Sequence, residues 1–478
     1  MRDYRQFYIN GQWQSAEQRD VIDVINPATE VVAGQVAAGQ SEDVDAAVKA
    51  ARKAFKSFSQ TDKQTRMDLL SRICEVYKER STDIAAAITE EMGAPKWLAA
   101  DHQSKSGYGH FKSALNILRD FEFVQKTDGS ETRFEPIGVC GLITPWNWPM
   151  NQIGCKLAPA LATGNTVVWK PSEVAPFSAQ ILMEVLEEAG VPAGVVNMVH
   201  GDGPTVGSAI SKHPDIDMVS FTGSTQAGIE VAKDAAATIK RVTQELGGKS
   251  ANIILDDLSA EQFSKAVAGG AKALCVNSGQ NCNAPSRLFV PLSRQQEAED
   301  IVKKTLEKIH VGDPGSETTF TGPVVSKTQW QRIQNHLENG VAEGARIVTG
   351  GPGYPAGLNK GFYVKPTAFS DVENDMSIAK QEIFGPVLSI LTYEDDQQAI
   401  AMANDNPYGL SGYVSGNDEG RVNNIVKGLR AGVIHVNGAT MQGTEPFGGY
   451  KQSGNGRERG VAGFYEYLET KAVLKKDC

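Results

Sequence analysis

The stretch MVSFTGSTQAGIEVAKDAA (residues 218–236) runs from an apolar segment through a glycine turn into a helical pattern. Gly223, Thr225 and Gly228 stand at the three glycine positions of a dinucleotide-binding fingerprint, with threonine in the second. A strand that enters a helix through such a turn presents free backbone N–H groups and the positive end of the helix dipole to an anion. Ser224 and Thr225 add hydroxyl groups. The stretch therefore predicts a strand–turn–helix unit that either binds phosphate or only caps its helix.

Similar apolar runs, separated by helical stretches, continue on both sides of this unit. The first series is IGVCGLITP (137–145), TVVWKP (166–171), VVNMVHG (195–201) and RVTQELGG (241–248). A second series comprises ANIILD (251–256), SRLFVP (286–291), PVLSILTY (386–393), LSGYVSG (410–416) and AGVIHVNG (431–438). Apolar strands that alternate with helices predict βαβ units around a parallel sheet. The 478 residues exceed what one core usually holds, so we expect an α/β protein with two such units.

Other segments lie outside these two series. Short strands and turns precede residue 40, and residues 41–121 show helical periodicity. EFVQKTDGSETRFEP (122–136) alternates around an Asp-Gly turn at Asp128, which is typical of a β-hairpin. GFYEYLETKAVLKKD (463–477) is a late strand candidate.

Charge and composition exclude several classes of function. The net charge of −10 argues against a nucleic-acid or anionic-membrane partner, since both require a basic face. No apolar run reaches the about eighteen residues of a membrane span, and MRDYRQFYING lacks the apolar core of a signal peptide. The six cysteines form no CxxC pair, which is typical of free thiols in a reducing compartment. We therefore expect a cytoplasmic protein without a bound metal.

Lys170 follows the apolar run TVVW, at the strand end where open α/β sheets bind their ligands. Glu173 lies three residues later. A lysine beside a carboxylate could hold the ribose hydroxyls of a dinucleotide. The simpler interpretation is a salt bridge on a solvated loop, and the residues themselves favour that alternative.

Cys282 stands in VNSGQNCNAPSR (276–287), a polar, turn-forming segment where burial as a small hydrophobe is unexpected. A reactive thiolate requires a positive field or a base. None of the seven histidines lies in a recognisable motif, so the sequence shows no Cys-His pair, although one could assemble in space. The segment alone allows either a nucleophile or an inert thiol.

Two polar residues could assist a nucleophile at Cys282. Glu245 ends an apolar strand and precedes two glycines, which would allow a ligand to approach closely. It could act as a general base or belong to the first turn of a helix. Asn147 lies in the proline-bounded turn PWNWP (145–149) and could form an oxyanion hole with the backbone N–H of Cys282. The alternative for Asn147 is hydrogen bonding within its own turn.

In order and over nearly the whole chain, these stretches resemble the aldehyde dehydrogenase superfamily. The matching segments are PWNWP, KPSE, FTGSTQAG, ELGGKSA, NSGQNCNAPSR, EIFGPV, NPYGLSG and PFGGYKQSGNGRE. The resemblance implies a Rossmann-like NAD-binding domain (1–120 and 137–247) and an α/β catalytic domain (248–447). It also implies a β-hairpin oligomerisation arm (121–136, with 459–478) that joins a partner subunit in a homodimer or homotetramer.

The resemblance assigns roles that the residues alone leave open. Cys282 would attack the aldehyde carbon, Asn147 would stabilise the oxyanion, and Glu245 would activate the water that hydrolyses the thioester. Lys156 and Glu458 match a charged pair behind Glu245. The positions that match the cofactor site are Thr144, Trp146, Lys170, Glu173, Gly223, Ser224, Gly247, Glu382 and Phe384.

Two of these matches imply a cofactor and a reaction branch. The carboxylate of Glu173 would accept hydrogen bonds from a ribose diol and repel a 2′-phosphate, which favours NAD over NADP. Glu245 favours hydrolysis of the thioester to a carboxylic acid, since CoA-acylating relatives usually lack this base. The same Cys282 and Glu245 would also serve a non-redox esterase or thioesterase. A non-catalytic relative is disfavoured because both residues are present.

The substrate tunnel can be predicted only by position. Its wall would be formed by Trp148, Gln152, Cys155, Asn281, Asn283, Met441 and Phe447. Because this wall contains no arginine, it predicts an uncharged aliphatic or aromatic aldehyde. Trp148 and Phe447 could also hold a quaternary ammonium, so betaine aldehyde remains an alternative, as does a semialdehyde. Arg459, in the unusual segment GRERG, has no role that the sequence explains.

Overall fold

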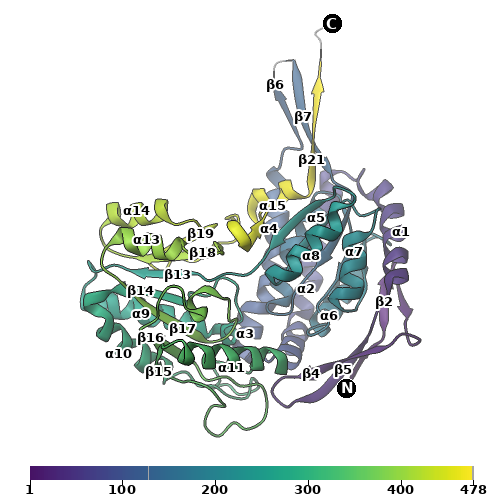
Figure 1. Ribbon diagram of the computed structural model, residues 1–478. Coiled ribbons are helices and arrows are strands. Elements are labelled where there is room, and N and C mark those ends of the chain that lie inside the picture. Colours follow the sequence, from purple (N-terminus) through teal and green to yellow (C-terminus); the bar gives the residue numbers. More distant parts are fainter. Residues whose placement is uncertain (128, 476–478) are drawn as a thin grey trace.

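The computed structural model describes residues 1–127 and 129–475, which fold around two large sheets (Figure 1). The first sheet has eight strands in the order β20-β12-β11-β8-β9-β10-β2-β3. Its parallel centre consists of β8 (Val139–Ile143), β9 (Thr166–Lys170), β10 (Val196–Met198), β11 (Met218–Thr222) and β12 (Arg241–Glu245). The outer strands β2 (Gln6–Ile9), β3 (Gln12–Ser15) and β20 (Gly454–Asn455) pair antiparallel.

The connection order of these strands creates a crevice at one edge of the sheet. From β8 the chain passes outward to β9 and β10, and then returns to the other side of β8 to form β11 and β12. Doubly wound sheets bind ligands at the carboxyl ends of the two strands that flank such a reversal. Here those ends are Ile143 and Thr222, and the segments that follow them begin the crevice.

Helices cover both faces of the first sheet. Along β8, Val139 and Ile143 face one buried apolar cluster, whereas Cys140 and Leu142 face another, as the two-residue period of a strand requires. The first cluster includes residues of α1 (Ser41–Phe58), α7 (Ser208–Lys212) and α8 (Thr225–Ala236). The second includes residues of α2 (Lys63–Met92), α4 (Ser104–Asp120), α5 (Pro149–Ala162) and α6 (Phe177–Glu188).

The second sheet has seven strands in the order β15-β16-β17-β14-β13-β18-β19. They are β13 (Ala251–Ile254), β14 (Arg287–Pro291), β15 (Arg346–Thr349), β16 (Thr367–Ser370), β17 (Val387–Tyr393), β18 (Ser411–Ser415) and β19 (Val433–Val436). The helices around it are α9 (Ala260–Cys275), α10 (Gln295–Leu306), α11 (Lys327–Ala342), α12 (Ser377–Lys380), α13 (Asp396–Asn404) and α14 (Glu419–Gly428). Because β14 and β17 run parallel, the segments that precede these two strands lie at the same edge of this sheet.

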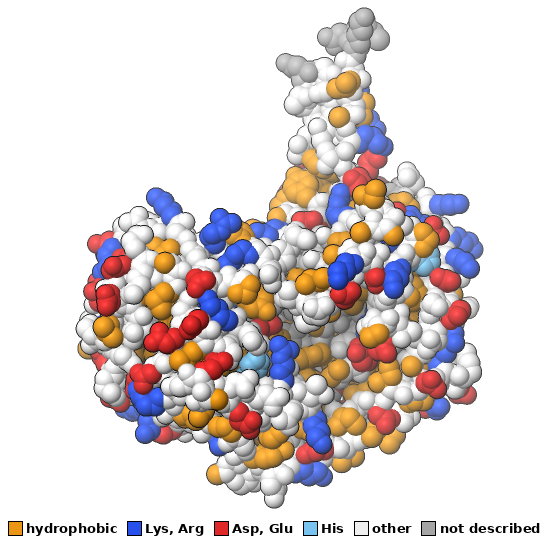
Figure 2. Space-filling view, in the orientation of Figure 1, with side chains coloured by type: hydrophobic (Ala, Val, Ile, Leu, Met, Phe, Trp, Pro, Cys, Tyr) orange, Lys and Arg blue, Asp and Glu red, His pale blue; other side chains and the backbone are white. Residues whose placement is uncertain are grey.

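A three-stranded arm projects from the body of the molecule (Figure 1). It consists of β6 (Val124–Thr127), β7 (Ser130–Pro136) and β21 (Leu468–Leu474), in the order β21-β7-β6. The pairing of β21 with β7 joins the predicted hairpin to the late strand candidate. Asp128 of the predicted turn and residues 476–478 lie outside the described residues. Apolar side chains lie at the base of the arm, and acidic and basic side chains are mixed over the body (Figure 2).

Smaller elements complete the fold. A second three-stranded sheet contains β1 (Arg2–Tyr4), β4 (Val21–Asn26) and β5 (Val31–Ala37). The remaining α-helices are α3 (Lys96–Leu98) and α15 (Gly460–Glu466), and α15 packs against α4 and α5. Short π- and 3-10 helices lie at Ala99–Gln103, Gly203–Gly207, Val276–Gly279, Leu292–Arg294 and Lys451–Ser453. Within the described residues, no helix has both the length and the apolar composition needed to cross a bilayer. The expected α/β class with two sheets is confirmed.

Candidate active site

A cavity of about 180 Å³ lies where the carboxyl edge of the first sheet faces the entry segments of the second. It is lined by Pro145, Trp146, Asn147, Gln152, Thr222, Gly223, Ser224, Leu246, Gly247, Cys282, Gln329, Arg332, Glu382 and Phe384. The strand reversal of the first sheet and the polar cysteine segment, which are far apart in the sequence, therefore meet in one site.

The backbone before Cys282 is held in a strained conformation. Asn277, Ser278 and Gly279 have successive φ values of +55°, +57° and +74°. Such a conformation costs about 1–3 kcal/mol at a residue other than glycine and persists only where its surroundings enforce it. Two hydrogen bonds do so, from Asn277 Nδ2 to the carbonyl of Asn147 (2.8 Å) and from Ser278 Oγ to the carbonyl of Gly322 (2.8 Å). The strain fixes the position from which Cys282 enters the cavity.

Gly279 also shows why this turn requires a glycine. A Cβ at this position would lie 2.1 Å from the carbonyl carbon of Gly385, in the loop between Glu382 and β17. The two backbones therefore touch. This contact ties the cysteine segment to the segment that carries Glu382 and Phe384, so all three side chains are positioned by one packed pair of loops.

Asn147 is buried on the turn between β8 and α5. Its side-chain nitrogen donates to the carbonyl of Gln280 at 3.1 Å, whereas its Oδ1 has no partner. An amide nitrogen carries two N–H groups, so one donor remains for an acceptor in the cavity. Pro149 follows at the first position of α5, where its missing N–H costs nothing. The side chain is therefore available next to Cys282 as a hydrogen-bond donor.

Glu245 lies at the carboxyl end of β12, and both of its carboxylate oxygens are buried without a hydrogen-bond partner. Burial raises the pKa of Glu245 well above its usual value, and the carboxylate of Glu458 raises it further, against the opposing charges of Lys156 and Arg457. A Cβ on Gly448 would lie 2.7 Å from Oε1, so only a glycine allows this approach. A buried carboxyl group with a raised pKa has the properties of a general base.

Lys156 and Glu458 form the buried charged pair that the resemblance implies. The ammonium group of Lys156 donates to Glu458 Oε1 (2.5 Å) and to Ser220 Oγ (3.0 Å). Burial lowers the pKa of Lys156, but Glu458, Cys155 and Glu245 together raise it by more, so the net shift is upward. The pKa of Glu458 is lowered despite its burial, chiefly by Lys156. Both groups are therefore charged, and this charge acts on Glu245.

The thiol of Cys282 remains protonated in the protein without ligands. Burial raises its pKa to about 12, and the carboxylates of Glu382, Glu245 and Glu458 contribute, whereas Arg459 opposes them. Yet Cys282 is partly solvent-exposed, whereas the other cysteines within the described residues are buried. Cys282 is therefore an accessible thiol that requires a base before it can react.

Alkylation of Cys282 should accelerate steeply with pH. Because the pKa lies near 12, the thiolate fraction should rise about tenfold per pH unit between pH 6 and 9. The rate of carbamidomethylation of the Cys282 peptide by iodoacetamide, followed by mass spectrometry, measures this slope. A rate that levels off below pH 8 would contradict a raised pKa. The buried Cys275 peptide provides the internal control and should react far more slowly.

The residues that match the cofactor site fall into two groups. Trp146, Gly223, Ser224, Gly247, Glu382 and Phe384 line the cavity. The rings of Trp146 and Phe384 meet edge to face at 5.4 Å, and Gly248 N–H donates to Glu382 Oε1 at 3.0 Å. Burial raises the pKa of Glu382 to about 7. Ser224 caps α8, so the helix begins at this wall of the cavity.

Lys170, Glu173 and Thr144 lie beyond the cavity lining. The Lys170 ammonium contacts Glu173 Oε2 at 2.9 Å and the carbonyl oxygens of Pro171 and Gly201 at 2.8 and 2.7 Å. Thr144 Oγ1 accepts from the indole of Trp169 at 3.0 Å. The paired lysine and glutamate thus occur as the sequence suggested, and the carboxylate of Glu173 is the more exposed partner.

The predicted tunnel residues lie in different surroundings, and only some of them line the cavity. Gln152 lines the cavity, and the Trp148 indole donates to Asn281 Oδ1. The Cys155 thiol instead points to Glu458 Oε2 at 3.0 Å, and the carbonyl of Asn283 accepts from the Tyr413 hydroxyl. Phe447 pairs through its backbone with Glu458.

An arginine lies beside part of the predicted tunnel wall. Arg459 lies against two predicted wall residues, 5.1 Å from the Phe447 ring centre and 3.8 Å from the sulfur of Met441. It also donates to Asn151 Oδ1 at 2.8 Å. Asn151 was missed, although it lies one helical turn before Cys155 and therefore on the same face of α5. Arg459 follows Glu458 directly, but its direction depends on a backbone angle that the sequence does not show.

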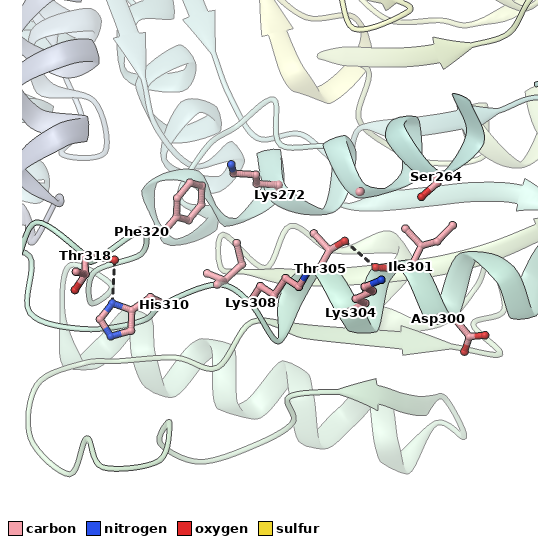
Figure 3. Close-up of a pocket in the computed structure, with 12 residues that line it drawn as sticks. Ser264, Lys272, Asp300, Ile301, Lys304, Thr305, Lys308, His310, Thr318 and Phe320 are labelled. Carbon is pink, nitrogen blue, oxygen red and sulfur yellow. Dashed lines mark hydrogen bonds between the residues drawn. The ribbon is translucent and has the colours of Figure 1, made fainter. Parts of the chain in front are cut away.

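A larger cavity, of about 680 Å³, lies elsewhere, between α9 and α10 (Figure 3). Lys272, Lys304 and Lys308 line it, together with the ring of Phe320. It contains none of the residues considered above. The smaller cavity, which contains Cys282, is therefore the candidate active site.

Comparison with known proteins identifies the family. The model of the aldehyde dehydrogenase family matches residues 13–473. The chain is 53% identical over 475 residues to 3-succinoylsemialdehyde-pyridine dehydrogenase from a Pseudomonas species, with 99% of each chain covered. A mutant of aldehyde dehydrogenase C from Pseudomonas syringae, in complex with NAD+ and octanal, has a TM-score of 0.97 at 47% identity, covering 98% of this chain and 96% of that one.

Another solved structure is also similar. Betaine aldehyde dehydrogenase from Staphylococcus aureus, in complex with NAD+, has a TM-score of 0.94 at 35% identity, covering 98% of this chain and 95% of that one. The likeness extends over both sheets and the arm. It confirms the family and fold that the eight sequence segments predicted. The chain belongs to the aldehyde dehydrogenase family.

Proposed function

We propose that this protein oxidises an aldehyde to a carboxylic acid with NAD as the hydride acceptor. The observation that carries the proposal is the single cavity lined by Cys282, Asn147, Glu382 and Phe384, with Glu245 at the end of the adjoining β12. NAD complexes of the structurally similar enzymes support a nicotinamide cofactor.

The first step is attack by the sulfur of Cys282 on the aldehyde carbon. The thiol is protonated at rest, so a base must remove its proton, and Glu245 has the raised pKa that this requires. The aldehyde oxygen becomes an oxyanion as the thiohemiacetal forms. The free amide N–H of Asn147 and the backbone N–H of Cys282 would stabilise that charge.

Three groups of the cavity lining match parts of a dinucleotide. Ser224 and the N-terminus of α8 present donors for a pyrophosphate, Glu382 offers a carboxylate for a ribose, and Thr222 Oγ1 is buried without a partner. Trp146 and Phe384 supply aromatic surface. When bound, NAD supplies the hydride acceptor that converts the thiohemiacetal to a thioester.

Glu245 would activate water for hydrolysis of the thioester after the proton that it took from Cys282 has left through the buried pair Lys156 and Glu458. Both of its oxygens are free of other hydrogen bonds, so one can accept a proton from water that attacks the acyl carbon. The buried pair Lys156 and Glu458 lies behind it and would carry the proton away. Cys282 leaves as the thiolate and is reprotonated. The same residues could hydrolyse an ester without NAD. Sustained ester turnover without the cofactor would favour this alternative function.

NAD should be used in preference to NADP. The carboxylate of Glu173, held by Lys170 but still partly exposed, would repel a 2′-phosphate. We expect kcat/KM to be about tenfold to a hundredfold higher with NAD, measured as absorbance at 340 nm on a panel of aldehydes. Glu173→Gln should narrow that ratio, whereas Glu187→Gln, on the remote α6, should leave it unchanged. An equal rate with NAD and NADP in the wild type would refute the preference for NAD. Absence of NADH formation with every aldehyde of the panel would refute aldehyde oxidation as the function.

The projecting arm fits a role in assembly. A small sheet that extends from the body offers an open edge at β6 and exposed apolar side chains such as Val124 and Leu474. We propose that it joins a second copy of this chain in a homodimer or homotetramer.

The name of the semialdehyde dehydrogenase that is 53% identical supports a substrate with a second functional group, in place of the plain aldehyde that the sequence suggested.

A further inference from the structure

The cavity between α9 and α10 is larger than the candidate active site, and the proposed oxidation does not use it. Its volume of about 680 Å³ lies within the range of about 300–1,000 Å³ that is usual for small-molecule sites. Part of its wall is apolar and is formed by the side chains of Ala268, Ile301 and Ile309 and by the Phe320 ring (Figure 3). This part can cover the apolar body of a small molecule.

Three lysines line the same cavity. Lys272 belongs to α9, Lys304 belongs to α10, and Lys308 follows the end of α10 (Figure 3). Within the part of the chain that the structure describes, none of their ammonium groups forms an ion pair or a hydrogen bond. The lining also contains Asp300, but its carboxylate accepts from Gln296 Nε2 at 3.1 Å rather than from a lysine. The three ammonium groups are therefore available to an anion.

The helix ends offset part of this positive charge. Lys272 and Lys304 lie in the last turns of α9 and α10, where each helix dipole is equivalent to about half a negative charge. Together with Asp300, the two helix ends offset about two of the three positive charges of the lining. About one positive charge remains, although the chain as a whole has a formal net charge of −10. This surplus fits a single anionic group rather than a polyphosphate.

The loop that carries Phe320 is held in place by several contacts. The Phe320 ring stacks on Trp97 with 5.4 Å between ring centres, and the indole N–H of Trp97 donates to a backbone carbonyl of the same loop at 3.1 Å. Thr321 Oγ1 donates to the carbonyl of Cys275, at the end of α9, at 2.9 Å. The ammonium group of Lys272 lies 5.2 Å from the centre of the Phe320 ring. This wall is therefore formed before a ligand arrives, which lowers the entropic cost of binding.

We propose that this cavity binds a small carboxylate with an apolar or aromatic body. The carboxylate would lie among the ammonium groups of the three lysines, and the body would cover the apolar wall. An uncharged molecule of the same shape would leave the lysines without a partner, and a carboxylate without a body would leave the apolar wall exposed. No residue lines both this cavity and the one that contains Cys282, so the inference goes beyond aldehyde oxidation and does not depend on it.

Fluorine NMR of 4-fluorobenzoate tests the inference on the protein saturated with NAD, which occupies the other proposed anion site. We expect 4-fluorobenzoate to bind about tenfold or more tightly than 4-fluorobenzyl alcohol, which keeps the ring without the charge. Acetate, which keeps the charge without the ring, should displace it only at a concentration about tenfold or more above that needed with unlabelled benzoate. Equal affinity for the acid and the alcohol, or no binding of either, would overturn the proposal.

A pair of double variants locates the bound carboxylate. Lys272→Gln with Lys304→Gln should weaken binding of 4-fluorobenzoate by about fivefold or more, because two charged contacts are lost. Lys265→Gln with Lys303→Gln is the matched control, since it removes the same charge from α9 and α10 outside the lining. The control should change the affinity by less than about twofold. Equal losses in both double variants would show attraction by the general surface charge and would overturn the proposal.

A third variant changes the shape of the cavity without changing its charge. Ala268→Trp places a large ring against the apolar wall and should abolish binding of 4-fluorobenzoate, with the melting temperature as the check that the protein is folded. Unchanged binding in this variant would place the carboxylate elsewhere and refute the site. These measurements need no turnover. Absence of NADH formation would therefore refute aldehyde oxidation alone, and absence of 4-fluorobenzoate binding would refute this inference alone.

Discussion

Replacing Cys282 with alanine should abolish aldehyde oxidation while the protein remains folded. The sulfur is the group that would form the thiohemiacetal, and no other cysteine lines the cavity within the described residues. We expect kcat/KM to fall by roughly 10⁴-fold or more, because loss of a covalent nucleophile is not compensated by its neighbours. NADH formation with the best aldehyde of the panel, together with NAD binding by fluorescence and the melting temperature, measures the effect.

The control for this prediction is Cys74→Ala. Cys74 lies on α2 in the second buried apolar cluster and is not part of the cavity lining, and burial raises its pKa to about 11. Its loss should lower stability by about 1 kcal/mol and leave activity within about twofold. Substantial oxidation by the Cys282→Ala protein, with NAD still bound, would show that another group performs the chemistry.

Replacing Glu245 with glutamine should stop the reaction after the first turnover. Glutamine retains the size of the side chain but cannot accept a proton from water, so the thioester on Cys282 should accumulate. Because Glu245 also takes the proton of Cys282 in the proposed first step, we expect a burst of about one NADH per active site that is slower than in the wild type. The steady rate that follows should be lower by about 10²- to 10⁴-fold. Stopped-flow absorbance measures the burst, and intact mass spectrometry should show the acyl group on the protein.

The matched control is Glu230→Gln on the exposed side of α8, where the carboxylate pairs with Lys233. It should change neither the burst nor the steady rate by more than about twofold. A slow steady rate without a burst would instead place Glu245 in deprotonation of Cys282 alone. In that case the base for thioester hydrolysis would have to be another group.

Much of the fold could be predicted because its strands are apolar on both faces. In β8, β9 and β11 every residue is buried, so the corresponding runs consist mostly of valine and other apolar residues. The alternating polar hairpin and the glycine turn before α8 are equally local patterns. Each follows from a few consecutive residues, and the structure confirms them.

The interpretation of individual side chains was less secure. Cys155 and Gln152 lie three residues apart on α5, yet one points to Glu458 and the other lines the cavity. The sequence does not reveal the surroundings of Arg459, because the direction of this side chain follows from a positive φ and from the pairing of Phe447 with Glu458. Neither feature leaves a pattern in neighbouring residues, so no periodicity could reveal it.

The sequence by itself determined the two α/β units, the strand–turn–helix unit around Gly223 and the polar segment of the cysteine, because hydrophobic period and turn chemistry are local. Tertiary structure alone decided that Asn147 and Cys282 line one cavity, and that Leu246 and Gly247, directly after Glu245, belong to the same lining. Asn147 follows β8 and Glu245 ends β12, both in the first sheet, whereas Cys282 precedes β14 in the second, and only the approach of the two sheets brings these segments together. Tertiary structure also decided the protonation of Glu245 and Glu458, because the burial of these groups and the charges near them arise from packing.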